Sequence, residues 1–208
     1  MRKLFVFFVL TLAVNMASAQ WSVGGKLGMN WSKVVNCPSI GGISSDELFD
    51  IRFRPGLNLG AVVNYQLSDW FDLQGELLYS QYNYEDKAGL VIESGPSTIK
   101  SKLKHHNHYL DIPLLVQFYP LKHDSGFSLE AGVQPGFFLA ESINIENVNI
   151  GGGNKPVSCA LVVGSSFKAP ENWFIDFRYI FGLTDTYKNI DGMNMQSAQI
   201  SVGYLFRL

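Results

Sequence analysis

Three closely spaced histidines, His105, His106 and His108, are the residues of this chain whose type and spacing most directly suggest chemistry. Side chains two positions apart in a β-strand point the same way, so His106 and His108 are candidate ligands for one metal ion. A metal site needs at least a third protein ligand, and the sequence identifies none. We therefore expect polar loop residues here, with no metal and no cofactor.

The same histidines can be combined with Ser101 and Asp111 into a nucleophilic site at a rim. These residue types are too common for the combination to be specific. The glycine-rich segment 151–156 lacks the Walker spacing, and the sequence contains no G-x-S-x-G motif. We predict that the protein is not an enzyme.

A second set of candidate residues consists of charged side chains that all lie on the polar face of segments with alternating apolar and polar residues. Within an eight-stranded barrel they would point inward, where the interior is only wide enough to be filled by side chains. Buried charges must be paired, so we expect a structural network of salt bridges, with a narrow gated conduit as the alternative. The predicted interior network comprises Lys26, Asp72, Glu76, Asp111, Glu130, Asp176, Arg178 and Arg207.

The two cysteines, Cys37 and Cys159, are both expected near the extracellular side, in oxidising conditions. A disulfide bond between them would tether the first long loop to the barrel rim, if their Cα atoms come within about 7 Å. Two free cysteines are the alternative.

The N-terminal segment 1–19 predicts a secretory signal peptide. Arg2 and Lys3 precede an apolar stretch at 4–14, and 17–19 form an A-x-A cleavage site. Cleavage there leaves Gln20 as the first residue and a single barrel domain over 20–208. Because no other apolar run approaches about 18 residues, no transmembrane helix is expected. The chain of 208 residues is 47% hydrophobic and only 16% charged, with a net charge of −2, which argues against nucleic-acid binding.

Alternation of apolar and polar residues with a period of two recurs along the rest of the chain and predicts strands with two different faces. In 70–81, for example, Leu73 and Leu77 alternate with Asp72, Gln74 and Glu76. Each segment has roughly the ten residues that cross a membrane at a tilt. The eight predicted strands are 21–32, 55–67, 70–81, 109–120, 127–139, 157–167, 173–183 and 198–208.

The connections between these segments alternate in length. Short ones fall near 68–69, 121–125 and 169–172, and long ones near 33–54, 85–105, 142–156 and 185–195. This pattern predicts an all-β fold: a closed antiparallel eight-stranded transmembrane up-and-down β-barrel of the outer membrane, with its short turns in the periplasm. A soluble ligand-binding barrel is the alternative. Trp21, Trp70 and Trp173 fall at predicted periplasmic strand ends and Trp31 at an outer end, as expected of aromatic girdles.

The sequence resembles the PorT-like outer-membrane β-barrel proteins of Bacteroidetes-type bacteria. The matching segments, which together extend over most of the chain after the leader, are ELLYSQ at 76–81, YLDIPLL at 109–115, EAGVQPG at 130–136 and FRYIFGLT at 177–184. The resemblance implies an eight-stranded barrel in the outer membrane of a Gram-negative bacterium, and the founding member is associated with protein export by the type IX secretion system. Gly203, Phe206 and Leu208 resemble the C-terminal signature read by barrel-assembly machinery, although the last residue is Leu and not the commoner Phe.

Three classes of function follow. The first is a non-enzymatic interaction or assembly component linked to protein secretion. The second is a structural or adhesive surface barrel that acts through its extracellular loops, and the third, which we favour least, is a lipid- or metal-dependent enzyme at the rim. The expected partners are outer-membrane lipid and lipopolysaccharide, barrel-assembly machinery, and secretion-system or periplasmic proteins, with the barrel itself a monomer.

Overall fold

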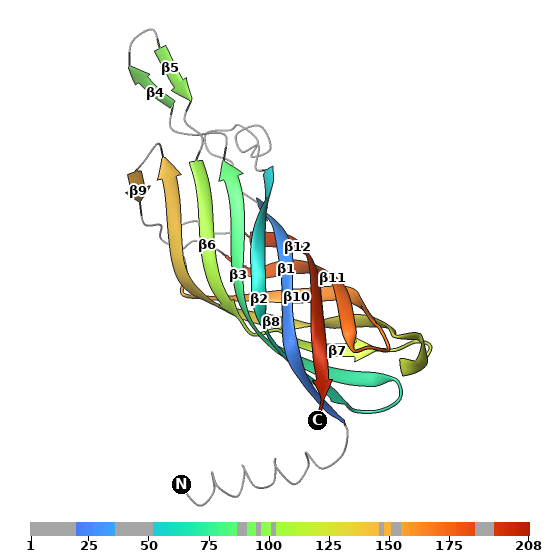
Figure 1. Ribbon diagram of the computed structural model, residues 1–208. Coiled ribbons are helices and arrows are strands. Elements are labelled where there is room, and N and C mark those ends of the chain that lie inside the picture. Colours follow the sequence, from blue (N-terminus) through green and yellow to red (C-terminus); the bar gives the residue numbers. More distant parts are fainter. Residues whose placement is uncertain are drawn as a thin grey trace, which may run out of the picture.

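The chain forms a single large antiparallel sheet rolled into a barrel (Figure 1). The computed structural model describes residues 20–35, 52–86, 91–94, 97–100, 103–145, 148–150, 155–185 and 194–208. Its strands are β1 Trp21–Val35, β2 Arg52–Gln66, β3 Phe71–Asp86, β4 Val91–Ser94, β5 Ser97–Lys100, β6 Leu103–Asp111, β7 Leu114–Phe118, β8 Phe127–Ile145, β9 Val148–Ile150, β10 Val157–Lys168, β11 Trp173–Asp185 and β12 Asn194–Arg207, with a 3-10 turn η1 at His123–Ser125. Among the described residues, no helix is long and apolar enough to cross a membrane.

Strands β6 and β7 are two halves of one barrel strand. Proline has no N–H to donate to a ladder, and the strand is interrupted at Pro113. The register is nevertheless unchanged across the gap, since β3 pairs Leu78 with Asp111 and Gly75 with Leu114. The interruption therefore leaves the predicted strand over 109–120 in place as one crossing.

The barrel is closed because each of its eight strands is paired on both sides. In order around the wall they are β1, β2, β3, β6/β7, β8, β10, β11 and β12, and β12 pairs back to β1. This arrangement confirms the predicted closed antiparallel eight-stranded barrel. Several strands extend further into the predicted long connections than the alternation indicated, because backbone pairing continues there; β3, for example, pairs Asp86 with Leu103 of β6. The segment 85–105 also contains the separate hairpin β4–β5.

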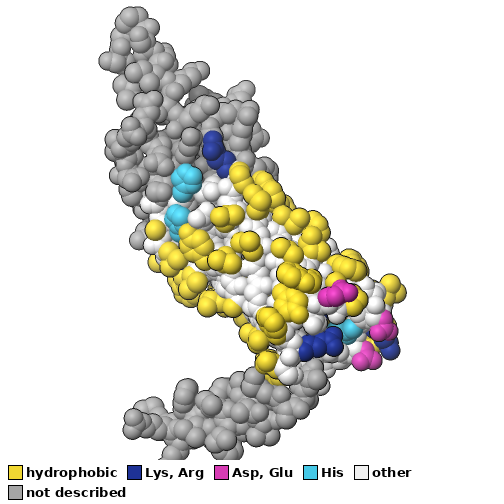
Figure 2. Space-filling model, in the orientation of Figure 1, with side chains coloured by type: hydrophobic (Ala, Val, Ile, Leu, Met, Phe, Trp, Pro, Cys, Tyr) yellow, Lys and Arg dark blue, Asp and Glu magenta, His cyan; other side chains and the backbone are white. Residues whose placement is uncertain are grey.

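The wall has apolar side chains outside and polar side chains inside. On β3, Asp72, Gln74 and Glu76 are buried, while Leu73 and Leu77 on the other face of the strand are 43% and 50% exposed. Figure 2 shows hydrophobic side chains across the middle of the visible face, with acidic side chains toward the lower right and cationic side chains near both ends. An exposed apolar surface of this extent is stable only in contact with lipid or another apolar partner.

Two neighbouring glycines on β1 show how tightly the strands approach one another inside the barrel. A Cβ atom on inward-facing Gly24 would overlap the backbone carbonyl oxygen of Tyr204 on β12. A Cβ on outward-facing Gly25 would meet nothing closer than 3.5 Å. The inward position thus requires the absence of a side chain, and the outward one does not.

One end of the barrel, which we call the short-turn end, carries the connections β2–β3, β7–β8 and β10–β11, together with the C-terminus (Figure 1). The opposite end, the long-loop end, carries the long connections. Trp21, Trp70 and Trp173 lie at the short-turn end, at or next to the first residue of β1, β3 and β11, and Trp31 lies toward the other end of β1. In outer-membrane barrels short turns face the periplasm and long loops face outside.

Candidate functional site

A layer of paired charges crosses the middle of the barrel. The guanidinium group of Arg178 on β11 donates to both carboxylate oxygens of Glu76 on β3, at 2.9 and 2.7 Å. Its Nε donates to Glu130 on β8 at 2.6 Å. All three side chains are at most 1% exposed, so the ions are sealed from water by the wall and by one another.

Lys26 on β1 completes the charged layer. Its Nζ lies 2.8 Å from Asp176 on β11 and 3.2 Å from Glu76. The layer therefore has two cations and three carboxylates, and each ion is within salt-bridge distance of an opposite charge. This arrangement compensates the large cost of removing charges from water.

The position of these residues around the wall shows that the layer spans the full width of the interior. In the barrel order, β3 and β11 are four strands apart in either direction, so Glu76 and Arg178 come from opposite sides. The same holds for Lys26 on β1 and Glu130 on β8. Side chains from opposite walls that are joined by direct hydrogen bonds leave no room for an open channel between them.

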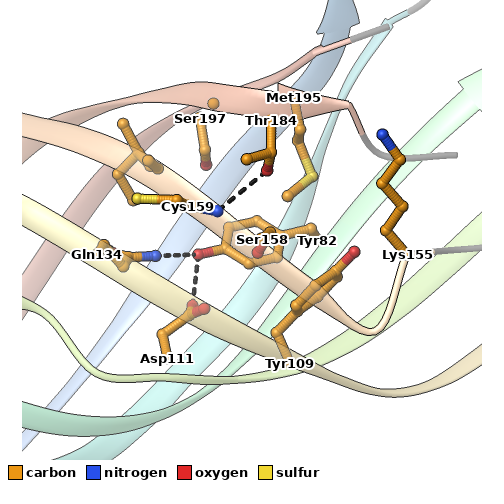
Figure 3. Close-up of a pocket in the computed structure, with 13 residues that line it drawn as sticks. Tyr82, Tyr109, Asp111, Gln134, Lys155, Ser158, Cys159, Thr184, Met195 and Ser197 are labelled. Carbon is orange, nitrogen blue, oxygen red and sulfur yellow. Dashed lines mark hydrogen bonds between the residues drawn. The ribbon is translucent and has the colours of Figure 1, made fainter. Parts of the chain in front are cut away.

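Asp111 lies apart from the charged layer, in a small polar group toward the long-loop end (Figure 3). It accepts a hydrogen bond from Tyr82 Oη at 2.6 Å, and Gln134 donates to the same hydroxyl at 2.9 Å. The adjoining cavity of about 30 Å³ has room for little more than one or two water molecules. Tyr82 and Gln134 were not among the predicted site residues, although both fall on the inward phase of their strands.

Asp72 lies near the short-turn end, where it interacts with the β7–β8 turn and not with the charged layer. His123 Nε2 of η1 is 2.9 Å from Asp72 Oδ1, and the histidine ring stacks on Tyr119 with centroids 4.0 Å apart. These contacts hold the turn against a cavity of about 490 Å³, which we call the mouth cavity. No sequence pattern marks His123, because it lies in a turn, outside any alternating segment.

Arg207 does not join the interior network, contrary to the prediction. It has the inward phase of β12, as Leu205 does, but it is the last residue of that strand and its side chain is exposed. Alternation identifies the face on which a side chain lies but not its depth, and at a strand end the inward face opens to solvent. Arg207 lines the mouth cavity instead.

His106 and His108 both lie on the outer face of β6, as their spacing predicts, but each has its own partner. His106 Nδ1 is 3.0 Å from Asn83 Oδ1, and His108 Nδ1 is 2.7 Å from Tyr79 Oη. Within the described part of the chain, no three His, Cys, Asp or Glu residues are grouped so that they could hold a metal ion. Asp111 points to the opposite face of β6, so the nucleophilic combination drawn from the sequence is not assembled; Ser101 lies outside the described residues.

The remaining predicted sites are only partly within the described residues. Cys159 is half-buried on β10 and forms no disulfide bond with another described residue, whereas Cys37 and the leader 1–19 lie outside the described ranges. The disulfide bond and the cleavage therefore stay predictions. Of the C-terminal signature, Gly203 is buried inside the barrel, while Phe206 and Leu208 are 61% and 52% exposed on its outer face.

A polar interior closed by ion pairs, inside an apolar outer wall of eight antiparallel strands, defines a membrane-embedded β-barrel. The sequence of residues 15–188 matches the family described as "Outer membrane protein beta-barrel domain". The chain belongs to this family and is an outer-membrane β-barrel protein. No curated protein matches the sequence.

The fold is similar to that of solved outer-membrane barrels, among them the following two. Neisserial surface protein A (NspA) gives a TM-score of 0.55 at 13% identity, over 91% of this chain and 98% of that one. Ail, the attachment invasion locus protein of Yersinia pestis, solved with the heparin analogue sucrose octasulfate, gives a TM-score of 0.50 at 15% identity, over 90% of this chain and 99% of that one. At such low identities the similarity concerns the fold alone.

Proposed function

We propose that this protein is a non-enzymatic interaction or assembly component of the outer membrane, linked to protein secretion as its resemblance to the PorT-like proteins implies. The observation that carries the proposal is the charged layer of Lys26, Glu76, Glu130, Asp176 and Arg178, which fills the cross-section of the barrel. A filled barrel cannot work as an open pore. Its two ends are then the parts that act on other molecules.

The proposal includes how the protein reaches its place. Residues 1–19 act as a cleaved leader, barrel-assembly machinery reads the C-terminal signature with Gly203, Phe206 and Leu208, and the folded monomer sits among lipid and lipopolysaccharide. Secretion-system or periplasmic proteins are its partners.

Cross-linking in intact cells, followed by purification of the barrel and identification of what accompanies it, tests the assembly role. We expect a reproducible set of secretion or periplasmic proteins, and loss of protein export in a deletion strain. A barrel recovered only with lipid and lipopolysaccharide, together with normal export in the deletion strain, contradicts the role.

An adhesive surface barrel is a second candidate, and the length of the strands favours it. Strands β3 and β8 have 16 and 19 residues, although about 9–11 suffice to cross a membrane. The extra residues lie toward the long-loop end and can present loops to other cells or polymers, and the fold neighbour Ail was solved with a heparin analogue. A deletion strain that exports normally but no longer adheres would favour this candidate over the first.

A lipid- or metal-dependent enzyme at the rim is the least supported class. His106 and His108 face outward, each bonded to a neutral partner, and Asp111 faces inward. Replacing both histidines with alanine is expected to leave export and adhesion unchanged.

A further inference from the structure

The mouth cavity at the short-turn end has no role in the charged layer. Its volume of about 490 Å³ far exceeds the 30 Å³ of the cavity beside Asp111. Its lining comes from several separate parts of the chain: the short-turn ends of β1, β2, β3, β10 and β12, and the turn that contains η1. In the orientation typical of outer-membrane barrels, it opens to the periplasm.

Two cationic side chains line this cavity, and both stand at the last position of a strand. Lys168 ends β10 and is half-buried, and Arg207 ends β12 and is exposed. Lys168 is close enough to Arg207 to be repelled by its charge. Within the described ranges neither residue forms a salt bridge, so the pair has the electrostatics of a site that attracts an anion.

The acidic groups at the mouth leave that attraction in place. Asp72 attracts Lys168, but it is buried and directly bonded to His123. Asp124 also lines the cavity, but it is exposed on the η1 turn, where solvent screens its charge. Lys122 lies outside the lining and pairs with Asp69 at 3.5 Å. A carboxylate that enters the cavity can therefore bind Lys168 and Arg207 without displacing a salt bridge of either residue.

Neutral hydrogen-bonding groups lie beside the cations. Ser22 pairs with Arg207 across β1 and β12, and Gln66 adds an amide from the end of β2. A hydroxyl and an amide beside two cations suit a ligand that offers peptide N–H and C=O groups together with a carboxylate. The stack of His123 on Tyr119 and the contact between His123 and Asp72 keep the cavity in shape before a ligand arrives.

We propose that the mouth cavity binds a carboxylate-bearing peptide segment of a periplasmic partner protein, with Lys168 and Arg207 holding the carboxylate and the segment passing beside Gln66. This inference rests on the proposed assembly function and specifies the partner's chemistry.

The test is site-specific photo-cross-linking in intact cells, with p-benzoylphenylalanine in place of Gln66 and, as a control, in place of Leu121. Leu121 is 71% exposed on the turn that contains η1, at the same end of the barrel, but it does not line the cavity. Each probe is placed in three backgrounds: the otherwise unchanged protein, the double variant Lys168→Gln/Arg207→Gln, and the control variant Lys122→Gln. The control removes a charge at the same end of the barrel but outside the cavity. Heat-modifiable electrophoretic mobility shows that each variant is folded, and Lys168→Gln alone replaces the double variant if that does not fold.

We expect a discrete protein adduct at position 66 that falls about tenfold in the double variant, because two charge-assisted hydrogen bonds are lost, and that persists in Lys122→Gln. The cross-linked partner peptide should contain Asp, Glu or a free C-terminus. The proposal is overturned if position 66 gives no protein adduct, or if the adduct is equally strong in the double variant. It is also overturned if the partner peptide contains no carboxylate, or if cell-wall material is captured instead of protein. If whole-barrel cross-linking recovers partners while the probe at position 66 does not, only the proposed mouth site is contradicted. If neither experiment recovers a partner, the proposed assembly function is contradicted as well.

Discussion

At the scale of single residues, Arg178 is the side chain on which the interior most depends. It bonds to two carboxylates from two strands, Glu76 and Glu130, in a space that excludes water. A buried ion pair contributes little relative to an apolar replacement of both partners, but removal of one partner leaves a buried charge without compensation. The network is therefore sensitive to single substitutions.

We predict that Arg178→Met destabilises the folded barrel by about 3–5 kcal/mol, because Glu76 and Glu130 lose their shared cation. Urea unfolding of the protein in lipid vesicles measures the change. Arg207→Met, at the exposed end of β12, is the matched control and should cost about 0.5 kcal/mol or less. The double variant Glu76→Gln/Arg178→Met should recover part of the loss, and a loss of under about 1 kcal/mol in Arg178→Met would contradict the buried network.

At the scale of elements, the close approach of β1 to β12 decides which side chains a strand can carry. The inward and outward glycines of β1 are adjacent in sequence but face different surroundings. Only the inward one is enclosed by a neighbouring backbone, which cannot move aside as a flexible side chain can.

Gly24→Ala should therefore destabilise the barrel by about 1–3 kcal/mol or prevent its assembly, since the added methyl group overlaps the carbonyl of Tyr204. Gly25→Ala, one residue away, should change stability by less than about 0.5 kcal/mol. Heat-modifiable mobility and urea unfolding compare the two variants. Equal effects at both positions would show that β1 does not have the register described here.

The orientation of the strands gives a further prediction at this scale. In a Cys37→Ser/Cys159→Ser background, a cysteine at Pro156, at the long-loop end, should react with a membrane-impermeant maleimide on intact cells. A cysteine at Ser68, in the β2–β3 turn, should react only after the outer membrane is permeabilised. The reverse pattern would place the short turns outside and move the mouth cavity to the cell surface.

At the scale of the whole molecule, closure of the sheet and filling of its interior together make a sealed barrel. We expect no steady conductance from the protein in planar lipid bilayers, because hydrogen-bonded side chains from opposite walls occupy the cross-section. The variant Glu76→Ala/Glu130→Ala/Arg178→Ala, which removes the largest part of the charged layer, serves as the positive control and should conduct. A large, steady conductance from the unaltered protein would show that the layer is not a seal.

The sequence by itself determined the architecture of this protein. Alternation with a period of two is a property of each strand separately, and the lengths of the connections follow directly from the spacing of the segments. Lys26, Asp72, Glu76, Asp111, Glu130, Asp176 and Arg178 could therefore be assigned to the inner face before any coordinates, and all seven are buried inside the barrel.

Only the tertiary structure decided which of these charges meet. Arg178 and Glu76 are 102 positions apart, and their contact depends on the curvature and register of the closed sheet, which no local pattern encodes. The depth of a side chain along the barrel is equally absent from the sequence pattern. Arg207 has the inward phase of β12 but lies at the open short-turn end, and His123 contacts Asp72 from a turn that has no alternating pattern. Local residue patterns specify faces and lengths, whereas the pairing of buried charges and the shape of cavities arise from strands that meet only when the barrel closes.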